Sequence, residues 1–296
     1  MAGEIGSGTL SEALNTVVGA CRYVSEFKRE GTWQRTCDVV KQEEGTGEDW
    51  REFQLHKVTA QDITETTENR NYQVLAGTIL SGTPTMSQIV IKITDRAYRK
   101  LAKIVTSKFG PIAGFAMERK KQDDYLALFS GFSTQASPGT GNPFTSGHVM
   151  AAVSNIVSNT QEGSMAEVHT VCHGRQLYDL QTEVVAAIGT YAIPAGMTEE
   201  VYRRGFKGTV AGSNVWVSDD IPIDSTPDAN AATHAKNGVI HIKSMELKTK
   251  RDYDIYYGGG AEVLSLVDEY AFLERTSQST QVWCYRHLSD ATAPSS

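Results

Sequence analysis

The first thirty residues carry apolar positions at the spacing of an α-helix. Thr9 and Glu12 fit a capping box that begins a helix, and Gly31 fits its stop. The apolar residues between them lie three or four apart: Leu10, Leu14, Val17, Val18, Cys21 and Val24. This pattern predicts an amphipathic helix. It is either the first helix of the core or an arm helix that docks on a neighbouring subunit.

Residues 38–73 break this pattern, because they are rich in Glu, Asp, Thr and Gln and poor in apolar side chains. Within them, residues 50–58 predict a short strand. Two further strands are expected over 72–80 and 88–93, joined by a Gly/Pro turn at 81–84. A compact domain rarely carries such a long polar stretch. We therefore expect a long, two-stranded, largely polar protrusion that returns to the body near residue 93.

Helical periodicity resumes over residues 95–132, with Leu101, Val105 and Phe109 in phase. Gly110 and Pro111 predict a break, followed by a second helix of roughly 20 residues that starts at Pro111, spans about 30 Å and is capped by Gly131. The middle of that helix, residues 118–124, is polar all round. This is typical of a bridging helix or a solvated face with an ion pair between Lys120 and Asp124.

The rest of the chain alternates between the two periodicities. A Ser/Gly/Pro loop covers 133–147, a Gly/Pro-rich excursion covers 189–208, and a loop of small polar residues covers 223–236. Helices are expected at 147–158 and 175–188. Strands are expected at 166–172, 209–218, 238–243, 245–257, 262–274 and 280–286. The predicted class is α+β, with one continuous body and a long appendage.

Composition narrows the function only a little. The 296 residues can bury a large core, and 40% of them are hydrophobic. The net charge of −7 argues against tight duplex binding, because phosphate neutralisation needs clustered Lys and Arg. Such a chain can still enclose nucleic acid without gripping it.

The N-terminus has no secretory pattern, and no apolar run reaches the length of a membrane span. We therefore expect a soluble protein made in the cytoplasm and not attached to a membrane. The cysteines are scattered without metal-ligand spacing, so they are expected to be reduced and mostly buried: Cys21, Cys37, Cys172 and Cys284.

The sequence offers no catalytic, cofactor-binding or metal-binding motif. We therefore expect no catalytic, cofactor-binding or metal-binding residues and no cofactor. His169 and His173 lie about 13 Å apart on an extended strand, too far to bind one metal ion, and Cys172 points to the opposite face. The acidic pairs at 123–124 and 219–220 have no identified partner, and adjacent residues face different ways. The chain is therefore not expected to be an enzyme.

The order of the predicted parts resembles the major capsid proteins of tailed double-stranded DNA bacteriophages, whose Hong Kong-type fold is shared with encapsulins and herpesvirus capsid floors. Each motif is weak alone, and the resemblance covers about residues 60–290. The stretches that carry it are Ile93 to Asp95 before a helix, Pro111 to Gly131 as the spine helix, Val168 to His173 before the helix at 175–180, and Gly208 to Pro222.

The resemblance implies a fold in five parts. These are an N-terminal arm (1–45), an extended β-hairpin loop (46–93), a peripheral domain with a long spine helix (94–132), an axial α/β domain (133–244), and peripheral-domain strands that return to the axial domain (245–296). It also implies hexamers and pentamers in an icosahedral shell that encloses DNA without sequence-specific binding. In such shells the extended loop lies over the adjacent subunit, and the spine helix and extended loop shift as DNA packaging drives expansion.

The implied partners are further copies of the chain, a scaffolding protein and a portal, with decoration proteins as an optional addition. The implied location is the virion, after assembly in the host cytoplasm. No long charged region precedes the arm, so a cleaved N-terminal scaffolding domain is not expected. Lys41 and Lys57 lie in or near the loop, but no residue stands out as a covalent cross-linking partner for them.

Three other functions remain open from the sequence. An encapsulin-type cage has the same fold but encloses cargo enzymes. The sequence motifs of this chain do not match those of encapsulins closely. An α+β enzyme would need polar groups that converge in space, which one sequence does not show. A tail-tube or other virion protein would be dominated by β-structure and lack the long helix.

Overall fold

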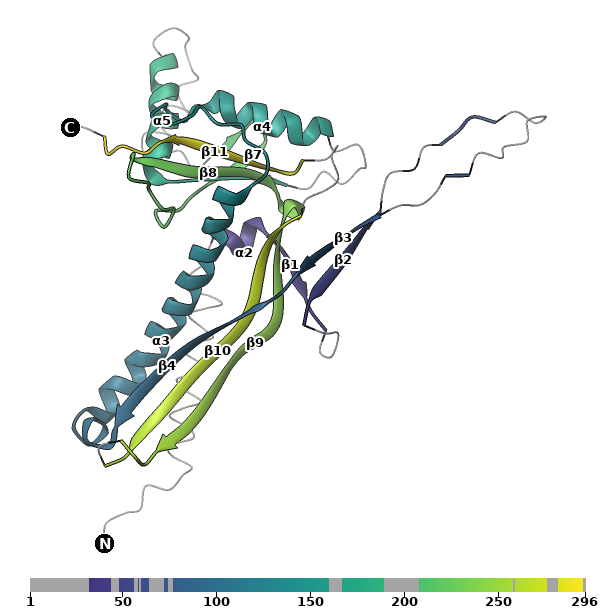
Figure 1. Ribbon diagram of the computed structural model, residues 1–296. Coiled ribbons are helices and arrows are strands. Elements are labelled where there is room, and N and C mark those ends of the chain that lie inside the picture. The colour runs from purple at the N-terminus through teal and green to yellow at the C-terminus, as the bar shows by residue number, and fades with distance from the viewer. Residues whose placement is uncertain are drawn as a thin grey trace.

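The computed structural model describes residues 32–43, 48–55, 58, 60–63, 72–73, 77–159, 167–188, 208–257, 259–275 and 282–294. The molecule is elongated, with two sheets, one long helix and a projecting two-stranded ribbon (Figure 1). The helix expected in the first thirty residues and the excursion at 189–207 lie outside the described residues. No described helix is both long enough and apolar enough to span a bilayer.

A four-stranded sheet and the helix α3 form the lower, elongated part of the molecule. The strand order is β1-β9-β10-β4, with β9 and β10 forming a long antiparallel hairpin and β1 parallel to β9. The elements are α2 (Thr32–Thr36), β1 (Asp38–Lys41), β4 (Thr85–Thr94), α3 (Asp95–Ala127), β9 (Val239–Asp254) and β10 (Ala261–Glu274). At 33 residues, α3 is about 50 Å long and runs along the sheet (Figure 1).

Packing between α3 and this sheet explains why β4 alternates along its length. Ile89 and Ile91 face the helix, whereas Val90 between them is exposed. On the helix, Ala113 and Met117 lie one turn apart and are buried in the same apolar cluster. The sheet therefore supports the middle of the helix along one stripe.

A five-stranded mixed sheet, in the order β11-β8-β5-β7-β6, forms the upper part of the molecule. The helices α4 and α5 pack on one face. The C-terminal end of α3 packs on the other face through Tyr125, together with Phe129 and Phe132, which follow α3. The elements are η2 (Leu128–Gly131), α4 (Ser146–Asn159), β5 (Val168–Cys172), α5 (Gly174–Ile188), β6 (Thr209–Val210), β7 (Ser213–Val217), β8 (Asp228–Ala235), η3 (Lys236–Gly238) and β11 (Cys284–Asp290). The chain therefore returns to this sheet at its end.

A separate two-stranded ribbon is formed by β2 (Trp50–Leu55) and β3 (Gly77–Gly82). It leads away from the body (Figure 1). Its strands pair only with each other among the described residues, so the ribbon is a projection rather than part of either sheet.

Two expectations for this region were wrong. The predicted turn at 81–84 does not reverse the chain, because β3 pairs with β2 whereas β4 pairs with β10. The chain therefore rejoins the body at Thr85 rather than near residue 93, and the ribbon consists of the strands before this point. The Gly/Pro signal marks a change of pairing partner, and sequence alone does not distinguish that from a hairpin.

The predicted helix break at Pro111 was also wrong, since α3 runs unbroken through Pro111. A proline costs one hydrogen bond and a local clash, but apolar packing just beyond it holds the helix on the sheet. The helix ends at Ala127 and continues as the 3-10 turn η2. Gly131 lies in that turn without a positive φ, so the predicted left-handed glycine cap is absent.

In the five-stranded sheet, the loop expected over 223–236 contains the strand β8, whose Ala and Thr side chains are buried between two neighbouring strands. The strand expected over 209–218 is a hairpin of β6 and β7, with Ala211 and Gly212 at positive φ in its turn. The two strands expected over 238–257 form the single strand β9. Gly259 and Gly260, just before β10, lie at positive φ.

Candidate functional site

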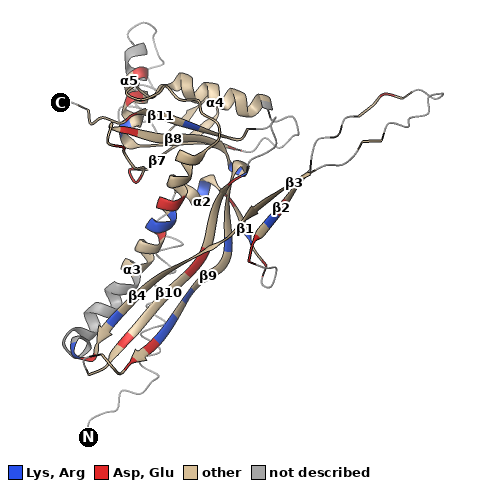
Figure 2. Ribbon diagram, in the orientation of Figure 1, with Lys and Arg blue, Asp and Glu red and all other residues tan. Residues whose placement is uncertain are grey.

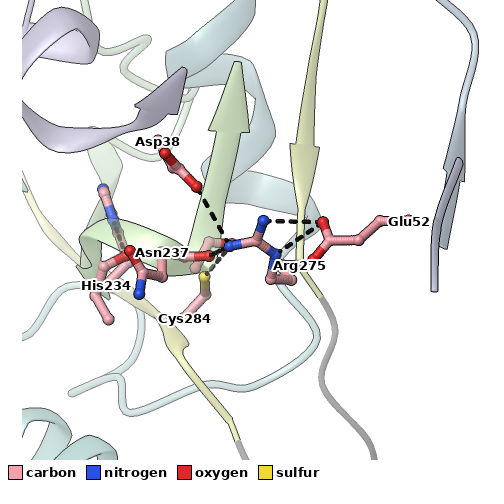
Figure 3. Close-up of polar contacts among 8 residues, drawn as sticks. Asp38, Glu52, His234, Asn237, Arg275 and Cys284 are labelled. Carbon is pink, nitrogen blue, oxygen red and sulfur yellow. Dashed lines mark hydrogen bonds and ion pairs between the residues drawn. The ribbon is translucent and has the colours of Figure 1, made fainter. Parts of the chain in front are cut away.

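The base of the ribbon is held by one arginine. Arg275, directly after β10, donates to Glu52 of β2 through Nη2 (2.8 Å) and Nε (3.2 Å). Its Nη1 donates to the carbonyl oxygen of Asn237 (2.8 Å) and lies 3.5 Å from the carboxylate of Asp38 in β1 (Figure 3). Arg275 therefore joins the ribbon, the four-stranded sheet and the link to the five-stranded sheet.

A glycine lets the ribbon approach the body closely. A Cβ atom at Gly82 would lie 2.0 Å from Cδ1 of Leu273 in β10, closer than any real contact. Gly82 and the Arg275–Glu52 contact are therefore two points at which the ribbon lies against the body.

The ribbon presents an exposed apolar pair. Phe53 and Ile79 lie directly opposite each other across the two strands, and they are 59% and 63% exposed. An isolated two-stranded ribbon gains little stability in water. An exposed aromatic–aliphatic pair on such a ribbon is typical of a surface that is covered by another molecule.

A second exposed apolar surface lies at the far end of the β9–β10 hairpin. We call it the tip, and it consists of Tyr253, Ile255, Tyr256 and Tyr257. Lys92 of β4 supports it, with its Nζ 3.7 Å from the ring centroid of Tyr257 and 2.5 Å from the carboxylate of Asp254. The Lys92 ammonium lowers the pKa of that exposed carboxyl.

A third surface is the solvent side of α4. This helix contains no Asp, Glu, Lys or Arg, as its uniform tan colour in Figure 2 shows. Met150 and Val157 are about half exposed on it. A surface helix normally carries charge on its outer face, so a charge-free face also fits a protein contact.

The middle of α3 carries charges that are buried rather than solvated. The sequence predicted a bridging or solvated face here, and the pair between Lys120 and Asp124 is present at the surface. Glu118 and Lys121, however, are only 2% and 7% exposed. Lys121 Nζ lies 2.6 Å from Asp268 of β10 and 3.4 Å from Glu118. The charges of α3 are buried here because Asp268 of β10 faces them from the sheet. Asp268 lies at a register shift in the pairing of β10 with β9.

Hydrogen-bonded side chains cross the five-stranded sheet. The hydroxyl of Thr170 lies 2.7 Å from that of Ser213 and 2.9 Å from that of Thr233. The Thr233 hydroxyl in turn lies 2.9 Å from Nε2 of His287. His287 Nδ1 lies 2.6 Å from the carbonyl oxygen of Ala136 and must donate to it. Neutral His287 therefore accepts from Thr233. The Thr233–His287 pair resembles a nucleophile with its base, but both side chains are fully buried and no substrate reaches them.

Burial holds two histidines of this region in the neutral form. It lowers the pKa of His234 and of His287 to about 4. Tyr125 of α3 lies 2.8 Å from Nε2 of His234, so this histidine also joins the helix to the sheet. Protonation of either ring would charge a buried group.

We therefore expect acid to destabilise the unassembled subunit. The folded pKa values lie below the unfolded value of 6.5, so the stabilisation is complete above pH 6.5 and is lost as pH falls towards 4. The loss is about 3 kcal/mol for each histidine over that range. Asp179 and Glu274 act in the opposite direction, because burial raises the pKa of their carboxyl groups.

Urea unfolding between pH 7 and pH 4 measures this loss. The slope of unfolding free energy against pH reports the number of protons that the chain takes up on unfolding. A His287→Gln variant should lower this number by about one relative to the natural chain. An unchanged slope in that variant would show that His287 is not a buried neutral group.

The candidate residues from the sequence do not converge on a site. His169 accepts from Trp216 Nε1 at 3.3 Å and lies near His234, whereas Cys172 is buried in the α4–α5 core, where burial raises the pKa of its thiol to about 12. Within the described part of the chain, no three His, Cys, Asp or Glu side chains are grouped closely enough to hold a metal ion. The three described cysteines are free and buried, as expected: Cys37, Cys172 and Cys284.

The two acidic pairs do come close to each other, which the sequence did not show. Burial and the nearby charge of Asp220 raise the pKa of Asp123. Arg119 and Lys120 oppose this shift. A pair of carboxylates at the junction of α3 with the five-stranded sheet remains an electrostatic feature of the surface rather than a catalytic arrangement.

Comparisons with known proteins find likeness only in structure. No family model matches the sequence, and no curated protein matches it. The capsid structure of the cyanophage P-SCSP1u is similar with a TM-score of 0.66 and 10% identity over 89% of both chains. The head structure of Helicobacter pylori bacteriophage KHP40 has a TM-score of 0.65 and 10% identity, covering 89% of this chain and 93% of that one. The capsid of Ralstonia phage GP4 has a TM-score of 0.65 and 9% identity, covering 90% and 93%.

The long helix on a sheet, the second mixed sheet and the projecting ribbon define an elongated α+β fold. More narrowly, this fold is that of the tailed-phage major capsid proteins, and it extends over most of the chain. The fold class expected from the sequence is therefore confirmed, although identity is low.

Proposed function

We propose that this chain is the major capsid protein of a tailed phage, which assembles as hexamers and pentamers into an icosahedral shell around double-stranded DNA. The observation that carries the proposal is the capsid fold together with the ribbon, which holds Phe53 and Ile79 away from its own body. Many modest contacts of this kind add up to a stable shell. The role is structural rather than catalytic.

The five parts expected from the sequence serve as our domain assignment, with one adjustment. The extended loop ends with β3 at Gly82, and it consists of the two ribbon strands and the segment between them. The strand β4 is assigned to the peripheral domain instead. The five-stranded sheet with α4 and α5 is the axial domain. A scaffolding protein and a portal are the partners that such assembly requires, decoration proteins are an optional addition, and the mature location is the virion.

Electron microscopy of the purified chain, expressed alone and with its neighbouring genes, tests this function. We expect closed shells, or hexamers and pentamers. Nucleic-acid absorbance in particles derived from virus separates a genome shell from an encapsulin-type cargo cage of the same fold. A uniform monomer or dimer in both preparations would refute the proposal.

The tip offers a sharper test of an assembly surface. Tyr256 is 94% exposed, so Tyr256→Ser should leave the unfolding free energy of the subunit within about 0.5 kcal/mol of the natural value. If the tip contacts another subunit, the same change removes a buried aromatic contact from every copy, and shell yield should fall at least fivefold.

Lys250→Ser, on the same hairpin, is the matched control and should assemble normally. Shell yield is measured by sedimentation with electron microscopy. Normal yield from both variants would remove the tip from the assembly surfaces.

A further inference from the structure

A pocket of about 320 Å³ lies in the lower part of the molecule, where α2, β1, α3, β9 and β10 meet. This volume is at the small end of the range for ligand pockets, so it suits one side chain better than a larger molecule. Val39 of β1 lines the pocket and is 48% exposed, so the pocket is open to solvent on that side. No residue of its lining belongs to the ribbon or the tip.

The lining of this pocket combines apolar and charged side chains. Trp33 and Val39 present apolar surface. Glu118 and Asp268 are buried, and both lie beside the ammonium group of Lys121. A carboxylate accepts several hydrogen bonds, so these paired groups can also accept one from an incoming hydroxyl. The pocket therefore matches a side chain with an apolar ring and a polar end, as tyrosine has.

The tip presents a tyrosine of this kind. Tyr256 is 94% exposed, and its hydroxyl has no hydrogen-bond partner among the described residues. The other two tyrosines of the tip are engaged within the subunit. Tyr253 donates to Asp95 at 2.6 Å, and Lys92 lies over the ring of Tyr257. The subunit thus holds the tip in place while the ring of Tyr256 projects into solvent.

The tip does not reach the pocket of its own subunit. Leu247 in the pocket and Asp254 at the end of β9 are separated by about 23 Å of extended strand. Figure 1 shows the tip at the free end of the β9–β10 hairpin and α2 near the other end. A contact between the two surfaces therefore joins different copies of the chain. Such a head-to-tail contact closes into a ring when the rotation between copies allows it.

We propose that Tyr256 of one copy inserts into this pocket of a second copy. The ring packs against Trp33 and Val39, and the hydroxyl donates to the carboxylate of Glu118 or Asp268. Tyrosine is one of the residues that most often dominate the energy of a protein interface. The inference rests on the proposed shell, because that assembly supplies the second copy and repeats the contact.

Photocross-linking tests which surface receives the tip. Tyr256→p-azidophenylalanine keeps the aromatic ring and carries a photoreactive group in place of the hydroxyl. Particles are assembled from ¹⁴N chains with this substitution and ¹⁵N natural chains, and are then irradiated. We expect peptides that join position 256 of a ¹⁴N chain to Trp33, Val39 or Leu247 of a ¹⁵N chain. Links to other surfaces of the chain, including residues 1–31, or to a different protein contradict the proposal.

A blocking variant tests whether assembly needs the contact. Val39→Trp places an indole at the open side of the pocket, and the urea midpoint of the subunit should not change because Val39 is half exposed. Shell yield should fall at least tenfold. Val90→Trp is the matched control, since Val90 is a similarly exposed valine on β4 of the same sheet but outside the pocket. Its yield should be normal.

Combining the two changes shows whether they act on the same contact. Tyr256→Ser together with Val39→Trp should assemble no worse than the poorer of the two single variants, because each removes the same interaction. Losses that multiply contradict the proposal, as does normal yield from Val39→Trp. Shells that form normally from Val39→Trp refute this inference alone. If the natural chain forms no shells at all, the proposed function fails and the inference fails with it.

Discussion

The Arg275→Ala variant is expected to fold but to lose closed shells almost completely. The guanidinium contacts Glu52 of the ribbon, Asp38 of β1 and the carbonyl oxygen of Asn237. Its removal leaves those groups without their shared donor and frees the ribbon from the body. A ribbon that moves freely loses conformational entropy when it binds another subunit. This cost weakens every inter-subunit contact that the ribbon makes.

The cost to the subunit itself should be moderate. Arg275 is largely buried, but both carboxylates are about one-third exposed, so water replaces part of the lost interaction. We expect a loss of about 1–3 kcal/mol in unfolding free energy and at least a tenfold loss of shell yield. Urea unfolding and sedimentation measure the two effects separately.

Arg275→Lys is the informative control. Lysine keeps the charge but cannot reproduce the two-pronged contact with Glu52 and the bond to Asn237 together. Its shell yield should lie between those of the natural chain and Arg275→Ala. If Arg275→Ala assembles as well as the natural chain, the ribbon does not need this anchor.

Lys121→Met should produce the largest loss of stability of any single change considered for this chain. The substitution leaves the carboxylates of Glu118 and Asp268 buried against each other without their ammonium group. Breaking a buried ion pair in this way costs about 3–5 kcal/mol, a large part of the stability of a typical domain. Urea unfolding of the unassembled subunit is the measurement.

A triple variant separates lost charge pairing from lost packing. In Glu118→Gln, Lys121→Met and Asp268→Asn together, no buried charge remains uncompensated in this cluster. The triple variant should recover more than half of the stability lost in Lys121→Met. If it is no more stable than the single variant, packing of the lysine stem rather than charge balance explains the loss.

The elements that followed a strong local pattern could be predicted from the sequence. The strand β5, the helices α4 and α5 and the strand β10 match their expected positions to within a few residues. The elements that tertiary contacts determine could not. Pro111 is held inside α3 by the sheet, and the alanine-rich strand β8 is held between β5 and β11.

The candidate site was predicted less well than the fold. Arg275 follows a strand as an ordinary basic residue, and its partners in β1, β2 and η3 are far away in sequence. Lys121 belongs to a polar stretch that reads as solvated, and only the position of Asp268 in β10 shows that the charges are buried. The two outer surfaces had a visible signal in the sequence, since α4 lacks charge and the tip carries three tyrosines within five residues.

A cryo-electron microscopy reconstruction of particles assembled from the natural chain tests the central claim most directly. Our account predicts an icosahedral shell of hexamers and pentamers, with the five-stranded sheets around each capsomer centre and the ribbon of each subunit lying on another copy. A particle without such capsomers, or a ribbon that contacts only its own subunit, would contradict it.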